Sequence, residues 1–196
     1  MKLCFYLATK NKNKVKEIRD IIGDNFEILL PPDCIEFPEE KGRTLYENAY
    51  FKAEYLSRFF KDFYIVGEDS GLFVEKLNGL PGVNSAIFSG QRDDEKNIKK
   101  LLEMMKEYKR KEDRKAKFIT VVCLIGKRKK EFFEGEIDGY ITFEPIGNNG
   151  FGYDPIFEIP DIGKTFGQLS LKEKNKISHR TKAFLKLKEY LEREVK

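Results

Sequence analysis

The sequence predicts an α/β protein, and three observations lead to that fold class. Strand-like and helix-like hydrophobic patterns alternate along the chain. No segment is repeated or of low complexity. Hydrophobic residues make up 40% of the 196 residues, which is enough material for a folded core. A chain of this length corresponds to one domain, or at most to two small lobes that share a core.

Two strands and a helix are expected near the N-terminus. Lys2–Ala8 is predicted to be a buried strand, because the residues that follow Lys2 form a continuous apolar run. Lys12–Ile22 is predicted to be a helix, because its apolar residues recur at helical spacing and Gly23 is a typical helix stop. Phe26–Leu30 is predicted to be a short second strand.

A long helix and two further strands are predicted next. Thr44–Phe60 has apolar residues at helical spacing, and Thr44 with Glu47 forms a capping-box pattern at its start. Tyr64–Gly67 and Leu72–Glu75 are predicted strands on either side of an acidic segment.

The second half of the chain continues the alternation. Asp93–Tyr108 is predicted to be a helix and Phe118–Ile125 a buried strand. Glu131–Phe143 is interpreted as a longer strand pair, antiparallel to the preceding strand. Ser178–Val195 is predicted to be the closing helix.

The charge balance limits the function classes. Lys and Arg total 37 against 33 Asp and Glu, so the formal net charge is only +4. A protein that coats nucleic acid would be far more one-sided. Residues 96–130 are rich in Lys and Arg and are interpreted as a solvated helix face and a hairpin tip. The alternative is an RNA- or DNA-binding module built on these residues.

Cysteine and histidine usage limits the kinds of site. Cys4, Cys34 and Cys123 are far apart, which argues against a disulfide framework and against a zinc knuckle. His179 is the only histidine, so a site built on several imidazoles is excluded within one chain. Any metal is therefore expected to be held by carboxylates, which favours Mg²⁺ or Mn²⁺.

No apolar run reaches the length that spans a membrane, and the N-terminal run is too short for a signal peptide. We therefore expect a cytoplasmic protein without membrane contact.

A polar and basic segment links the first predicted strand to the first helix: Thr9, Lys10, Asn11, Lys12, Asn13 and Lys14. Backbone N–H groups at a helix N-terminus lack intrahelical partners and carry partial positive charge. Such a junction with added lysines is typical of a phosphate site, although it lacks the GxxxxGK[ST] pattern of a Walker loop. The alternative is an ordinary Asn-capped helix with exposed lysines.

Adjacent carboxylates, Glu68 and Asp69, come directly after a predicted buried strand. Burying them is unfavourable unless they are neutralised, and a divalent cation would do this and would hold a water against a phosphorus atom. Ser70 would let a ligand approach, and Glu39 or Glu40 would complete a Mg²⁺ shell. The alternatives are an acidic β-turn and a solvated loop.

A glycine-rich loop spans residues 147–155. Its aromatic residues, Phe151 and Tyr153, are suited to stack on a planar ring, and Asp154 to accept a ring N–H or to bind a metal. The alternative is a hydrophobic turn that packs against the edge of a sheet.

The last motif combines Lys174 with the start of the closing helix. Ser178 is a predicted N-cap, which places His179 and Arg180 in the first turn, where the helix dipole disfavours cations. This misfit indicates that both are kept for a purpose, and both can donate to a carbonyl oxygen. The alternative is a structural histidine.

Taken together and in this order, these motifs resemble the inosine triphosphatase family. The resemblance runs from Leu7 to about Leu187. It is carried by Ala8-Thr9-x-Asn11-x-x-Lys14, Gly42-x-Thr44-x-x-Glu47-Asn48-Ala49, Glu68-Asp69-Ser70-Gly71 with Leu80-Pro81-Gly82, Gly150-Phe151-Gly152-Tyr153-Asp154-Pro155, and Glu173-Lys174 with Ser178-His179-Arg180.

The resemblance implies a long central mixed β-sheet flanked by helices, with residues 1–196 forming one α/β domain of two lobes and an active-site cleft between the lobes. It also implies a homodimer that hydrolyses the purine nucleoside triphosphates ITP, dITP and XTP to the monophosphate and pyrophosphate. The cofactor would be Mg²⁺, with Mn²⁺ as a substitute, and no nucleic acid partner is expected. This activity would cleanse the nucleotide pool and prevent misincorporation.

Residue roles follow from the same resemblance. Asp69 would be the general base or a metal-bound carboxylate, with Glu68 and Glu39 as further metal ligands. Phe151 would stack on the base, and His179 with Arg180 would read its 6-oxo group. The full set of implied substrate contacts is Thr9, Lys10, Asn11, Lys12, Asn13, Lys14, Lys52, Ser70, Phe151, Gly152, Tyr153, Asp154, Lys174, His179 and Arg180.

One departure and two further alternatives remain. Lys10 stands where the family typically has glycine, so its side chain would add charge to the triphosphate or crowd it. A related pyrophosphatase acting on modified pyrimidine triphosphates should lack the 151–154 and 178–180 motifs. A catalytically dead homologue is disfavoured by the intact carboxylates.

Overall fold

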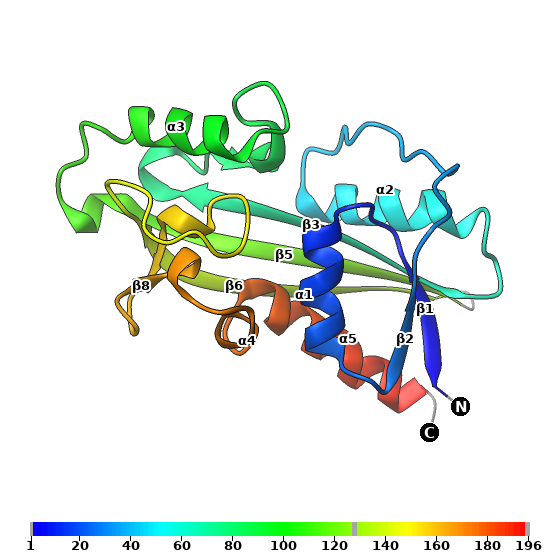
Figure 1. Cartoon of the computed structure of the whole chain (residues 1–196). Helices are drawn as coiled ribbons and strands as arrows, with labels where there is room; N and C mark the ends of the chain where they lie inside the picture. The colour runs from blue at the N-terminus through cyan, green and yellow to red at the C-terminus, as the bar shows by residue number, and fades with distance from the viewer. Residues whose placement is uncertain (1, 127–128, 195–196) are drawn as a thin grey trace. The chain divides into compact units, whose positions relative to one another are not determined.

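A computed structural model describes residues 2–126 and 129–194 (Figure 1). Its strands are β1 (Leu3–Leu7), β2 (Phe26–Leu29), β3 (Tyr64–Val74), β4 (Pro81–Gly82), β5 (Lys115–Gly126), β6 (Lys129–Ile141), β7 (Phe157–Ile159) and β8 (Lys164–Thr165). Its α-helices are α1 (Lys12–Ile22), α2 (Leu45–Ser57), α3 (Asp94–Met104), α4 (Leu171–Lys174) and α5 (His179–Glu194). The predicted end of the last helix, Val195, lies outside the described residues.

The strands form one mixed sheet in the order β2-β1-β3-β5-β6-β7-β8, with β4 beside β3. β1 pairs in parallel with β2 and with β3, whereas β4, β7 and β8 pair antiparallel with their neighbours. The predicted α/β class and mixed sheet are therefore confirmed. No helix within residues 2–126 and 129–194 is both long enough and apolar enough to cross a membrane.

The chain divides into two compact units. Unit 1 comprises residues 1–69, 120–135 and 179–196, and unit 2 comprises residues 70–119 and 136–178. Three strands, β3, β5 and β6, contribute residues to both units. The cleft expected between two lobes stays a prediction.

In unit 1, helices cover both faces of the sheet. On one face, α1 and α5 pack against Phe5, Leu7 and Val66. Gly67, the next residue of β3, points to the other face, and there a Cβ would lie 2.1 Å from the carbonyl oxygen of Ala49 on α2. A glycine at this position therefore lets the α2 backbone approach the sheet closely.

The bounds of α1 are as predicted, because both ends carry local signals. The Asn11 side chain caps the helix start, and Gly23 ends it with a positive φ of 75°. α2 is capped by Thr44, whose Oγ1 accepts from Glu47 N at 3.1 Å. Glu47 itself accepts from Arg43 N at 2.6 Å, so the predicted capping box is only half formed. α2 also ends at Ser57, one turn before the expected end.

The two strands predicted on either side of the acidic segment are one strand, so the predicted interruption was wrong, and so was the alternative of an acidic β-turn. β3 runs without interruption from Tyr64 to Val74, through both Glu68 and Asp69. The strand continues because cations from other parts of the sequence contact and neutralise both carboxylates, as described below. Glu131–Phe143 likewise contains a single strand, β6, rather than a pair.

Unit 2 has its own core. Leu72, Phe118 and Ile141 of the long strands pack with α3 and with the aromatic side chains of Phe157 and Phe166. The short elements β4, β7, β8 and α4 were not predicted, because two to four residues carry too little hydrophobic periodicity to be recognised.

Arg114 joins α3 to the end of β6. Its guanidinium is buried and donates to the carbonyl oxygens of Met105 at 2.8 Å, Ile141 at 2.6 Å and Thr142 at 2.7 Å. Burial lowers the pKa of Arg114 from its ordinary value. This residue lies in the basic 96–130 stretch, so the interpretation of that stretch as a solvated surface fails at Arg114.

Arg114→Lys should lower the free energy of unfolding by about 2–4 kcal/mol, because an ammonium cannot reproduce the planar fork and leaves buried carbonyls unpaired. Urea denaturation measures this loss. Arg110→Lys, an exposed arginine paired with Asp113, is the control and should change the free energy by less than about 1 kcal/mol. Equal effects of the two substitutions would contradict the structural role of Arg114.

Candidate active site

Glu68 and Asp69 are consecutive residues of β3, so their side chains point to opposite faces of the sheet. Glu68 points toward α1 and α5, and Asp69 points toward α2. Both residues are at most 5% exposed. Two buried carboxylates in the middle of a strand are unfavourable unless their charges are neutralised. On each face of the sheet, helix residues supply the neutralising cations.

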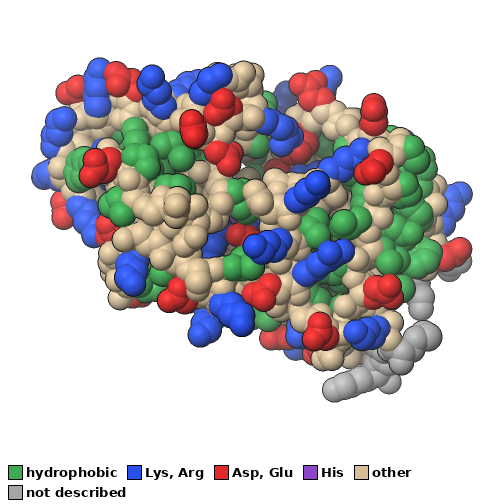
Figure 2. All heavy atoms as spheres, viewed as in Figure 1, with side chains coloured by type: hydrophobic (Ala, Val, Ile, Leu, Met, Phe, Trp, Pro, Cys, Tyr) green, Lys and Arg blue, Asp and Glu red, His purple; other side chains and the backbone are tan. Residues whose placement is uncertain are grey.

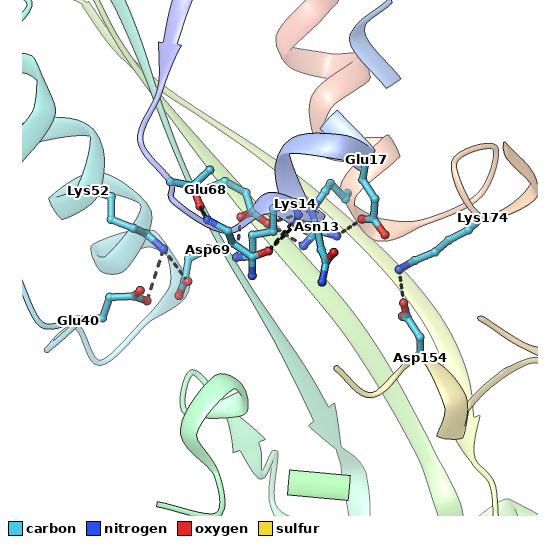
Figure 3. Close-up of polar contacts among 12 residues, drawn as sticks. Asn13, Lys14, Glu17, Glu40, Lys52, Glu68, Asp69, Asp154 and Lys174 are labelled. Atoms are coloured by element: carbon cyan, nitrogen blue, oxygen red, sulfur yellow. Dashed lines mark hydrogen bonds and ion pairs between the residues drawn. The ribbon is translucent and has the colours of Figure 1, made fainter. Parts of the chain in front are cut away.

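Glu68 belongs to a buried network of charges. Lys14 Nζ lies 2.7 Å from its Oε2, and Arg180 Nη2 lies 3.1 Å from its Oε1. Arg180 also forms a short ion pair with Glu17, a buried carboxylate of α1 (Figure 3). Burial would raise the pKa of Glu68, but Lys14, Arg180 and Lys52 outweigh burial and hold it well below the ordinary value.

Asp69 is held by two residues of α2. Lys52 Nζ donates to its Oδ1 at 2.9 Å, and Asn48 Nδ2 donates to its Oδ2 at 3.1 Å. The same ammonium lies 3.4 Å from Glu40 Oε2. Burial raises the pKa of Asp69, and Glu40 adds to this effect, so the net shift is upward despite Lys52 and Lys14.

The end of the β1–α1 loop and the first turn of α1 present positive charge at the surface. Lys10, Lys12 and Asn13 are exposed, and Figure 2 shows Lys and Arg side chains gathered over α1. Thr9 Oγ1 accepts from Asn11 N at 3.1 Å. Asn11 Oδ1 accepts from the backbone N–H groups of Asn13 and Lys14, so part of the predicted N–H anion site is already used by the helix cap.

Lys10 reaches away from the helix start. Its ammonium donates to the backbone carbonyl of Asp33 at 2.9 Å, in the segment between β2 and α2. In this arrangement the side chain neither fills nor crowds the helix N-terminus.

Of the two glutamates in the acidic loop, Glu40 lies beside the buried carboxylates. Glu39 is 78% exposed and pairs with Lys41 at 3.5 Å. Glu40 instead shares Lys52 with Asp69. Within the residues that the structure describes, no three His, Cys, Asp or Glu side chains are grouped to hold a metal by themselves.

Unit 2 has a cluster of its own, around Asp154. Asp154 Oδ2 accepts from Lys174 Nζ at 2.5 Å and from Phe151 N at 2.9 Å, and both charged residues are buried. The Lys174 ammonium lies 5.1 Å from the centre of the half-buried Phe151 ring. This pair therefore fixes both the backbone and one ring contact of Phe151.

Glycines shape the loop around this pair. Gly150 has a φ of 76°, and a Cβ there would lie 2.0 Å from Asp154 Oδ2. Gly152 N donates to Asp94 Oδ2 at 2.7 Å, which ties the loop to the start of α3. Tyr153 was expected to stack on a ligand, but it lies in the core and donates to Ser85 O at 2.9 Å.

The remaining predicted residues lie on β3 and α5. Ser70 is half-buried on β3. His179 is buried at the first residue of α5, where a Cβ on Gly135 would lie 2.2 Å from its carbonyl oxygen. Because Arg180 is bound to Glu68 and Glu17, its predicted role in reading a base stays a prediction.

Sequence reasoning missed four partners of these residues: Glu17, Asn48, Ser85 and Asp94. Glu17 had a usable signal, since a carboxylate among the apolar residues of one helix face must find a buried partner. Asn48 was part of a recognised pattern, but nothing in its local sequence indicated its contact with Asp69.

Comparison with known proteins places the chain in a family. The Ham1 family matches residues 5–190. A dITP/XTP pyrophosphatase of Caldanaerobacter subterraneus subsp. tengcongensis is 46% identical over 189 residues, which cover 94% of each chain.

Solved structures agree with this match. The Staphylococcus aureus Ham1 protein superposes with a TM-score of 0.86 at 35% identity, covering 97% of this chain and 99% of that one. The Coxiella burnetii HAM1 protein superposes with a TM-score of 0.85 at 33% identity, with the same coverage.

The fold and the clustered carboxylates define a mixed-sheet α/β protein with a lysine-balanced acidic site. The chain belongs to the Ham1 family, and the resemblance stated from the motifs is confirmed.

Acid should weaken the Glu68 network. Because the pKa of Glu68 in the folded chain lies below its ordinary value of 4.5, the network's contribution to stability is present above that value and is lost as the pH falls. Wild type should therefore lose up to about 1.4 kcal/mol per pH unit more than Glu68→Gln in acid. Urea unfolding at several pH values measures this difference.

Glu131→Gln, at an exposed position of β6, is the control for the loss of one surface carboxylate. Parallel pH profiles for wild type and Glu68→Gln would contradict the assignment.

Proposed function

We propose that the chain is a nucleoside triphosphate pyrophosphatase that hydrolyses dITP, ITP and XTP to the monophosphate and pyrophosphate. The observation that carries the proposal is the pair of buried carboxylates, Glu68 and Asp69, each balanced by a lysine. The names of the relatives support it, since they are called dITP/XTP pyrophosphatases.

Unit 1 has the residues for the phosphate chemistry. Cleavage between the α- and β-phosphates needs a water in line with the leaving pyrophosphate. Asp69 is suited to orient and deprotonate this water, because its raised pKa brings it closer to neutral pH than an ordinary aspartate. Lys52 and the lysines in the first turn of α1 would bind the charged phosphates and stabilise the pyrophosphate as it leaves.

The donor chemistry of this site fits Mg²⁺. Asp69 and Glu40 already flank one cation, the Lys52 ammonium. Magnesium is usually bound by one or two carboxylates together with substrate phosphates, so the lack of a three-residue cage among residues 2–126 and 129–194 agrees with an ion that arrives with the nucleotide. When bound, Mg²⁺ would neutralise charge on the triphosphate.

Unit 2 has the residues for contact with the base. The Phe151 ring can stack on a purine, and the Asp154–Lys174 pair holds the loop that carries it. A site that donates hydrogen bonds to a 6-oxo group rejects the 6-amino group of ATP, because buried donors would be left unpaired. Lys174 is a candidate donor in this unit, and His179, which the resemblance also implies, belongs to unit 1. A homodimer, which the family resemblance implies, and a cytoplasmic location also stay proposals.

Pyrophosphate release from ITP, XTP, dITP, GTP, ATP and dTTP tests the proposal. With Mg²⁺ present, we expect turnover of ITP, XTP and dITP, with ATP at least about 100-fold slower because of the unpaired donors. Chelation of the metal should abolish the reaction. Turnover of dTTP would keep the chemistry but overturn the base recognition, and the absence of release from any nucleotide would overturn the proposal.

Asp69→Asn should lower kcat by at least about 100-fold, since an amide cannot accept the proton of the attacking water. The substitution keeps the shape of the side chain, so circular dichroism and thermal unfolding should show a folded protein. Wild-type turnover by this variant would remove Asp69 from the mechanism.

A further inference from the structure

Asn48 connects Asp69 to the acidic loop. It lies in the first turns of α2 and is 3% exposed. Its Nδ2 donates to Asp69 Oδ2 at 3.1 Å, and its Oδ1 accepts from Gly42 N at 2.8 Å. A backbone N–H can only donate and a carboxylate accepts, so the two partners fix the orientation of the amide.

The contact between Gly42 and Asn48 requires a residue without a side chain at position 42. A Cβ on Gly42 would lie 2.3 Å from Asn48 Oδ1 and 2.9 Å from the Cβ of Glu47, closer than van der Waals contact allows. The absence of a side chain therefore lets the loop backbone reach the amide. Since Gly42 follows Glu40 by two residues, the same contact anchors the end of the acidic loop.

The two partners of Asp69 contribute different properties. Lys52 supplies a full charge on a long, flexible stem and is shared with Glu40. Asn48 supplies a neutral donor on a short side chain, held at both ends by hydrogen bonds. Lys52 therefore balances the charge of Asp69 at one carboxylate oxygen, whereas Asn48 binds the other oxygen with an amide that is itself fixed.

We propose that Asn48 is a positioning residue for hydrolysis: its amide holds the Asp69 carboxylate in the orientation that directs the attacking water. The inference rests on the proposed function, in which Asp69 acts on that water. Misdirecting a general base slows the chemical step but leaves the contacts that bind the nucleotide in place. A purely structural asparagine would change stability instead.

The chain offers a matched control for this distinction. Asn97 of α3 is 1% exposed and also uses both ends of its amide, accepting from Ser89 N at 2.7 Å and donating to Ala86 O at 3.1 Å. Neither of these partners is a carboxylate. Asn48→Ala and Asn97→Ala therefore each remove two hydrogen bonds of a buried amide, but only the first disturbs Asp69.

The test measures kcat and KM for ITP at saturating Mg²⁺, together with thermal unfolding. We expect Asn48→Ala to lower kcat about 10- to 100-fold with KM changed less than about threefold. Asn97→Ala should lower the Tm to a similar extent and keep kcat within about twofold of wild type. Equal kcat values for the two variants, or a change confined to KM, would overturn the inference.

Gly42→Ala is a second variant that leaves Asn48, Lys52 and Asp69 intact. Its added methyl group should displace the Asn48 amide and lower kcat in the same direction, even if Asn48→Ala fails to fold. Wild-type kcat in this variant would count against the inference. If wild-type enzyme turns over no nucleotide, the proposed function fails with it, whereas an active wild type with unaffected variants overturns the positioning role alone.

Discussion

The structure of unit 1 depends on the neutralisation of two carboxylates buried within one strand. Glu68 and Asp69 point to opposite faces of the sheet, so a helix on each face must supply a cation. On one face, Lys14 and Arg180 connect α1 and α5 through Glu68. On the other, Lys52 anchors α2 through Asp69. Removing one partner would leave an uncompensated buried charge, which destabilises far more than the loss of a surface pair.

In the proposed function, the same arrangement provides the chemistry. Opposite shifts in pKa separate the two neighbours, with Glu68 kept ionised by its cations and Asp69 pushed toward neutral pH by burial and by Glu40. Environments that shift the pKa values of two neighbouring carboxylates in opposite directions are typical of sites in which one carboxylate is structural and the other reacts. In unit 2, the buried Asp154–Lys174 ion pair holds the glycine-rich loop and contacts the Phe151 ring.

The sequence was sufficient to predict structure where the signal for an element lies in the element itself or next to it. The bounds of α1 follow from Asn11 and Gly23, and the motifs identified the family. The sequence was insufficient to predict contacts between residues that lie far apart along the chain. Arg180 and Glu68 are 112 residues apart, so nothing near Glu68 indicated that β3 could continue through it. The position of Glu40 rather than Glu39 beside Lys52 depends on a loop conformation, and Asn48 acquires its partner only when α2 packs on the sheet.

The Arg114 guanidinium is bound by carbonyl oxygens of Met105, Tyr108, Ile141 and Thr142. Carbonyl dipoles do not titrate, so protons do not compete for these bonds as they do for the carboxylates around Arg180. The hydrogen bonds that connect the end of α3 to the end of β6 are therefore expected to persist as the pH falls. Each unit thus contains a buried arginine. The partners of Arg180 are carboxylates, which protons neutralise in acid, whereas the partners of Arg114 are carbonyl oxygens, which acid leaves unchanged.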